Sequence, residues 1–136
     1  MATKIRTILY MGENQDNVHI FSQVINGSFP EVHLIVLDSC DKVITYLTDN
    51  LMTLPDLIFL DFNIEGNRDF SCLKALKVKE DLKHIPVINY ATANNPEEME
   101  EALLHGAYMY VPKPYTFDEA RIMLKEIIYG LEKGWT

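Results

Sequence analysis

No apolar run in the 136-residue sequence approaches the roughly 20 residues that a membrane-spanning helix needs. Residues 1–6 carry charge but lack the apolar segment of a secretory signal peptide. Positive charge is also scarce, since 20 acidic residues against 12 Lys and Arg give a formal net charge of −8. Such an acidic field disfavours DNA and anionic membranes as partners. We therefore expect a cytoplasmic protein with no membrane partner and no direct nucleic-acid partner.

Cysteine is limited to Cys40 and Cys72, and the four histidines show no metal-ligand spacing. In a chain without a secretory leader, we expect both cysteines to be free thiols in a reducing compartment. The sequence has no internal repeat and no low-complexity linker. Its length suits one domain, and the last predicted helix leaves only the tail 132–136, so we expect a single domain over residues 1–136.

Short apolar runs typical of buried strands alternate with stretches of helical periodicity. The predicted strands are residues 5–11, 32–37, 57–61, 85–90 and 107–111. The predicted helices are residues 14–26, 39–51, 70–79, 95–106 and 116–131. This alternation predicts an α/β fold in which a five-stranded parallel sheet carries helices on both faces.

The fourth predicted helix has a well-marked start. Asn95 is a suitable N-cap and Pro96 suits the first helical position. From the helical spacing we expect Met99, Ala102 and Leu103 to face the core.

Polar side chains stand where the predicted strands end. Glu13 follows the first strand, Asp61 ends the third, Thr92 follows the fourth and Lys113 follows the fifth. In a parallel sheet of order 2-1-3-4-5, the first and third strands are neighbours, and ligands bind outside the carboxyl ends of the strands. We therefore expect Glu13 and Asp61 to face one another at the mouth of the sheet.

Two adjacent carboxylates repel unless a cation lies between them, and Mg²⁺ suits such oxygen ligands. Lys113 can pair with a phosphate oxygen, and an aspartate can accept a phosphoryl group covalently. Each residue also has a plain structural interpretation. Glu13 can be a first-turn helix acid, Asp61 and Thr92 turn residues, Lys113 a solvated loop lysine, and Tyr110 a packed strand aromatic.

The segments 8–14, 56–63, 85–88 and 106–115, in this order and spacing, resemble the CheY-like receiver domain of two-component response regulators. The resemblance runs from residue 8 to about residue 131 and implies the flavodoxin-like strand order 2-1-3-4-5. It implies that Asp61 is the phosphoacceptor and Lys113 the active-site lysine. It also implies Mg²⁺ ligands from Glu13, Asp61 and the backbone carbonyl of Asn63.

The resemblance further identifies Tyr110 as the switch aromatic and Lys113–Pro114 as the peptide bond that is typically cis in the family. The switch Ser/Thr position reads Ala91, and Thr92 follows it. Because one residue of offset reverses the side-chain direction in a strand, Thr92 is not equivalent to a hydroxyl at position 91.

Two further departures from the family pattern bear on the site. The acid pair after the first strand is Gly12-Glu13, so the acid that usually works through water is missing, which affects Mg²⁺ binding. Glu65 replaces the proline that is common in the loop after the acceptor, a change of smaller expected effect.

Three hypotheses follow. The first is a stand-alone receiver, not a conventional enzyme, that takes a phosphoryl group on Asp61 from a histidine kinase or phosphotransfer protein. It would act on a downstream protein, or as a homodimer, through its helix 4, strand 5 and helix 5 surface. The second is a degenerate receiver that binds partners without phosphorylation. The third is a small flavodoxin-like or phosphatase enzyme. A flavodoxin-like site is disfavoured because residues 12–16 are acidic where a phosphate loop is needed. An aspartyl phosphatase is disfavoured because Asn63 stands where a second aspartate is needed.

Overall fold

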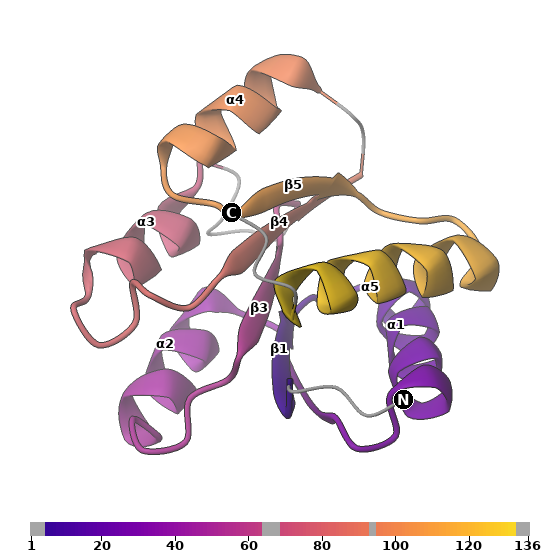
Figure 1. Cartoon of the computed structure of the whole chain (residues 1–136). Helices are drawn as coiled ribbons and strands as arrows, with labels where there is room; N and C mark the ends of the chain where they lie inside the picture. The colour runs from indigo at the N-terminus through magenta and orange to yellow at the C-terminus, as the bar shows by residue number, and fades with distance from the viewer. Residues whose placement is uncertain (1–4, 64–68, 93–94, 133–136) are drawn as a thin grey trace.

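The computed structural model describes residues 5–63, 69–92 and 95–132, over which strands and helices alternate (Figure 1). The strands are β1 (Thr7–Met11), β2 (His33–Leu37), β3 (Leu57–Asp61), β4 (Val87–Ala91) and β5 (Met109–Pro112). The helices are α1 (Gln15–Ser28), α2 (Cys40–Asp49), α3 (Ser71–Val78), α4 (Pro96–Leu104) and α5 (Phe117–Glu132). The predicted Glu65 loop lies outside the described residues.

The strands form one parallel sheet in the order β2-β1-β3-β4-β5, which confirms the predicted α/β architecture. Every residue of β3 and β4 is buried, whereas β2 at the edge is partly exposed. This burial matches the apolar character of the central strands.

Alternate residues of each strand enter two separate apolar clusters. Leu57 and Phe59 pack in the cluster under α1 and α5, whereas Ile58 and Leu60 pack in the cluster under α2, α3 and α4. Figure 1 shows these two helical layers on opposite sides of the sheet. Because side chains alternate along a strand, Asp61 leaves β3 on the α1/α5 side.

The apolar side chains of helix α4 are more exposed than the sequence predicts. Asn95 caps it as predicted, with its side chain accepting hydrogen bonds from the N–H groups of Glu97 and Glu98. Only Ala102 is fully buried, while Met99 and Leu103 are 38% and 46% exposed. The prediction that both large residues face the core is therefore wrong, because this short helix lies over the β5 edge of the sheet rather than its centre.

The prediction of free thiols is also wrong. Cys40, the first residue of α2, and Cys72 in α3 form a disulfide with a Cα–Cα distance of 5.7 Å. The pairing arises because α2 and α3 lie side by side on the same face of the sheet, which brings positions 32 residues apart within bridging range. The bond links the segments that follow β2 and β3.

We expect thiol titration of the denatured, unreduced protein to find no free cysteine. Reduction should lower the free energy of unfolding by about 4 kcal/mol, because it opens a loop closed by cysteines 32 residues apart in the unfolded chain. Two titratable thiols per chain before reduction would contradict this assignment.

The Lys113–Pro114 bond is trans, like every peptide bond in the described ranges, so the expected cis bond is not present. Trans is the intrinsically favoured isomer even before proline. None of the helices in the part of the chain that the structure describes combines the length and the hydropathy of a membrane-spanning segment.

Candidate functional site

The carboxyl ends of β1, β3, β4 and β5 border a cavity of about 330 Å³. Its lining comes from the turns that follow these strands and from the start of α1. The lining residues are Glu13, Asn14, Asn17, Asp61, Asn63, Thr92, Lys113, Pro114 and Tyr115. The structure therefore brings the predicted acids, lysine and threonine to one place, as the parallel sheet requires.

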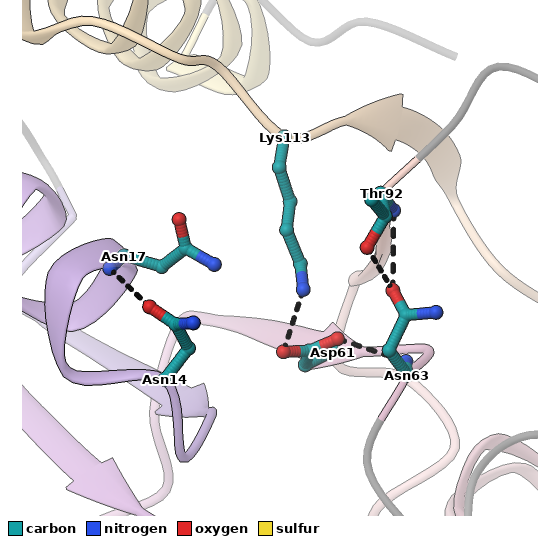
Figure 2. Close-up of polar contacts among 6 residues, drawn as sticks. All are labelled: Asn14, Asn17, Asp61, Asn63, Thr92 and Lys113. Carbon is teal, nitrogen blue, oxygen red and sulfur yellow. Dashed lines mark hydrogen bonds and ion pairs between the residues drawn. The ribbon is translucent and has the colours of Figure 1, made fainter.

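Asp61 lies at the base of this cavity and is only 3% exposed. Its Oδ2 pairs with Lys113 Nζ at 2.8 Å, and its Oδ1 accepts a hydrogen bond from the backbone N–H of Asn63 at 2.8 Å (Figure 2). The main chain of Lys113 is anchored as well, since its N–H donates to the carbonyl of Ala91 at 2.6 Å. The carboxylate is thus held with a cation and an amide directed at it.

Glu13 follows β1 and is exposed at the rim of the same cavity. No group of three or more His, Cys, Asp or Glu side chains with metal-binding geometry is found in the part of the chain that the structure describes. The family resemblance assigns Mg²⁺ binding to Glu13, Asp61 and the backbone carbonyl of Asn63, and these three residues line the cavity. Two carboxylates and a carbonyl, with water completing the shell, fit Mg²⁺, which keeps several waters in proteins.

Gly12 is buried and donates its N–H to the Leu37 carbonyl at 3.0 Å. A Cβ atom at this position would lie 2.1 Å from Cε1 of Tyr10. The missing acid therefore leaves no empty space, because the Tyr10 ring occupies the position of a side chain at residue 12.

Thr92 hydrogen-bonds to Asn63 rather than to Asp61. Its hydroxyl donates to Asn63 Oδ1 at 2.6 Å and its backbone N–H reaches the same oxygen at 3.2 Å (Figure 2). Ala91, one residue earlier, is buried in the apolar cluster under α2, α3 and α4. The described contacts thus join the segments after β3 and β4 through the side-chain oxygen of Asn63, whose backbone N–H donates to Asp61.

Comparison with known proteins decides the family. The sequence profile of the response regulator receiver domain matches residues 8–125. The chain belongs to the response regulator receiver domain family.

Individual relatives agree with this assignment. The receiver is 32% identical over 90 residues to the chemotaxis protein CheY-3 of Vibrio cholerae, covering 61% of this chain and 69% of that protein. Among solved structures, the Mn²⁺-bound form of response regulator Rcp1 superposes with a TM-score of 0.78 at 22% identity, covering 96% of this chain and 97% of that one. The phosphorylated cyanobacterial phytochrome response regulator RcpA gives a TM-score of 0.81 at 19% identity, covering 97% and 96%. These two structures share the fold of the receiver.

Tyr110 of the receiver is turned inward, with 9% of its surface exposed. Its hydroxyl donates a hydrogen bond to Glu98 Oε1 of α4 at 2.7 Å. Burial and then this acceptor raise the pKa of Tyr110 to about 12. The residue therefore connects β5 to the first turn of α4.

We expect the Tyr110 phenol to make stability fall at alkaline pH. Its pKa is about 10 in the unfolded chain and about 12 in the folded receiver, so the unfolded state loses this proton first. The stabilisation is complete below about pH 10 and is lost as the pH rises toward about 12. Between about pH 9 and about pH 11, the free energy of unfolding should fall by about 1 kcal/mol more in wild type than in Tyr110→Phe. Equal losses in denaturant titrations would contradict the raised pKa and thus the buried, hydrogen-bonded state of the Tyr110 phenol.

Sequence reasoning missed two buried tyrosines close to Asp61. Tyr10 and Tyr90 are buried, and their rings pack edge to face with centroids 5.8 Å apart. Burial raises the pKa of both phenols, and the negative charge of Asp61 raises each pKa further. Their position in the sequence could have indicated this, because each tyrosine immediately precedes the last residue of a strand that borders the cavity.

Proposed function

We propose that this receiver accepts a phosphoryl group on Asp61 from a histidine kinase or phosphotransfer protein. The observation that supports the proposal is the buried Asp61 carboxylate, paired with Lys113 at 2.8 Å and open to a 330 Å³ cavity. A carboxylate oxygen attacks the phosphorus, the bond from phosphorus to the donor breaks, and the donor leaves with that electron pair. The product is an acyl phosphate on Asp61.

The protein contributes mainly position and charge to this transfer. The Asn63 N–H holds one carboxylate oxygen, and Lys113 supplies a positive charge that can pair with a phosphoryl oxygen. Glu13, Asp61 and the Asn63 carbonyl would hold Mg²⁺, which neutralises negative charge on the phosphoryl oxygens when bound. By analogy, the Mn²⁺-bound structure of Rcp1 supports the proposed metal site, and the phosphorylated structure of RcpA supports the proposed phosphorylation.

The output surface is formed by α4, β5 and α5, where the receiver would bind a downstream protein or a second copy. Leu104 is 77% exposed on α4 and Ile122 is 53% exposed on α5, so apolar side chains are available there for a partner. Tyr110 and Glu98 join β5 to α4 beneath this surface. If phosphorylation of Asp61 moved the segments that follow β3 and β4, the output surface would change with them.

The direct test is incubation of the purified protein with a small phosphodonor such as acetyl phosphate. With saturating Mg²⁺, the intact mass should increase by one phosphoryl group, and a chelator should prevent the increase. A protein that stays unmodified at saturating Mg²⁺ would contradict the proposal.

A second candidate function is partner binding without phosphorylation. Gly12 lacks the second acid and Ala91 lacks a hydroxyl, so two groups that usually serve phosphorylation and switching are missing. If this function holds, Asp61→Asn leaves partner binding unchanged. A large loss of binding in that variant would count against it.

A further inference from the structure

The residues beside Asp61 on the neighbouring strands β1 and β4 carry no charge. Leu60 pairs with Met11 on β1, so the next residue, Gly12, lies at the level of Asp61. On the other side Asp61 pairs with Tyr90 of β4. Because side chains alternate along a strand, Tyr10 belongs to the same face of β1 as Gly12. A glycine and two tyrosines therefore surround the α1/α5 side of the carboxylate.

The Tyr10 ring leans along β1 toward the carboxyl end of the sheet. The positions nearest to a Cβ on Gly12 are Cε1, at 2.1 Å, and Cδ1 and Cζ, both at 3.0 Å. Cζ, which carries the hydroxyl, therefore lies beside Gly12, the residue that follows the partner of Leu60 and is level with Asp61. Phe21 and Tyr90 hold the ring edge to face, with centroids 4.6 and 5.8 Å away.

The hydroxyl of Tyr10 is buried and has no hydrogen-bond partner among the residues that the structure describes. A buried hydroxyl without a partner lowers stability, so this unpaired group is available to donate a hydrogen bond to a neighbouring charged or phosphorylated side chain. Burial, and then the negative charge of Asp61, raises the pKa of this phenol, so the proton is on the oxygen at neutral pH. The group is therefore a neutral hydrogen-bond donor.

We infer that Tyr10 is a positioning residue of the acceptor site: its ring replaces the side chain absent at position 12, and its hydroxyl donates a hydrogen bond to the Asp61 side chain, directly or through one water, when a phosphoryl group or its mimic is bound. This inference rests on the proposed phosphorylation of Asp61. In place of a second negative charge, the site has a neutral donor beneath the acceptor.

The hydroxyl is tested by Tyr10→Phe, which keeps the ring. We expect the rate of phosphorylation by acetyl phosphate and the affinity for beryllofluoride with Mg²⁺ to fall about tenfold, the factor for one hydrogen bond to a charged group. The denaturant midpoint should stay equal or rise, because an unpaired buried hydroxyl is removed. Tyr129→Phe, which alters a tyrosine packed on Phe29 far along α5, should match wild type in both readouts.

Unchanged rate and affinity in Tyr10→Phe, with a reactive wild type, would overturn the inference and leave the proposed function standing. A wild type that takes neither a phosphoryl group nor beryllofluoride would overturn both.

The ring is tested by stability alone, independently of phosphorylation. Gly12→Ala should lower the denaturant midpoint strongly in wild type, because the ring is packed and cannot swing away. In a Tyr10→Val background the same substitution should cause less than about half of that loss, because the neighbouring ring is gone. Equal losses in the two backgrounds would show that the ring does not occupy this position, which overturns the steric part of the inference.

Discussion

Asp61→Asn takes up no phosphoryl group from acetyl phosphate under conditions in which wild type takes up one per chain. The amide keeps the size of the side chain and can still accept the N–H of Asn63. It has no anionic oxygen to attack phosphorus, and it no longer forms an ion pair with Lys113. The expected effect is therefore a complete loss of modification, measured as intact protein mass.

Asp56→Asn is the matched control, since it makes the same substitution at the opposite end of the β3 segment. Asp56 Oδ2 accepts hydrogen bonds from the N–H groups of Arg6 and Thr7 at 2.8 and 3.1 Å, and an amide oxygen can keep these contacts. This variant should be modified as wild type is. Equal uptake by Asp61→Asn and wild type would assign the chemistry to another residue.

Lys113→Met should cause a larger loss of stability than the removal of a lysine from an exposed ion pair. The Lys113 and Asp61 side chains are only 10% and 4% exposed, so removal of the lysine leaves a carboxylate that is poorly hydrated. Breaking such a buried pair costs about 3–5 kcal/mol in the free energy of unfolding. The double variant Asp61→Asn/Lys113→Met should recover much of this loss, because it carries no unpaired charge.

Lys83→Met provides the comparison for this stability measurement. Lys83 pairs with Glu80 at 3.0 Å, but their side chains are 51% and 84% exposed, so its loss should cost less than about 1 kcal/mol. Denaturant titration of the four proteins measures all these differences. If Lys113→Met costs no more than Lys83→Met, the Lys113–Asp61 pair does not stabilise the fold.

The sequence was sufficient for the main architecture because apolar periodicity and strand ends are local properties. The runs around residues 57–61 and 85–90 are apolar because β3 and β4 are buried on both faces. The convergence of Glu13, Asp61 and Lys113 then followed from parallel strands in the order 2-1-3-4-5, and the structure places all three around one cavity.

The errors concern features that depend on packing between distant segments. The disulfide requires the position of α2 relative to α3, which the spacing of Cys40 and Cys72 does not contain. The exposure of Leu103 depends on where α4 lies over the sheet. The role assigned to Tyr10 depends on the direction of its ring over Gly12, a rotamer choice set by Phe21 and Tyr90.

Locating the phosphoryl group in the wild-type protein tests the central claim most directly. After reaction with acetyl phosphate and Mg²⁺, borohydride reduction converts an acyl phosphate on aspartate into homoserine, which peptide mass mapping can locate. We expect homoserine at position 61 and at no other aspartate, with none formed when Mg²⁺ is chelated. Homoserine at another position, or its absence at saturating Mg²⁺, would contradict the assignment of Asp61 as the phosphoacceptor.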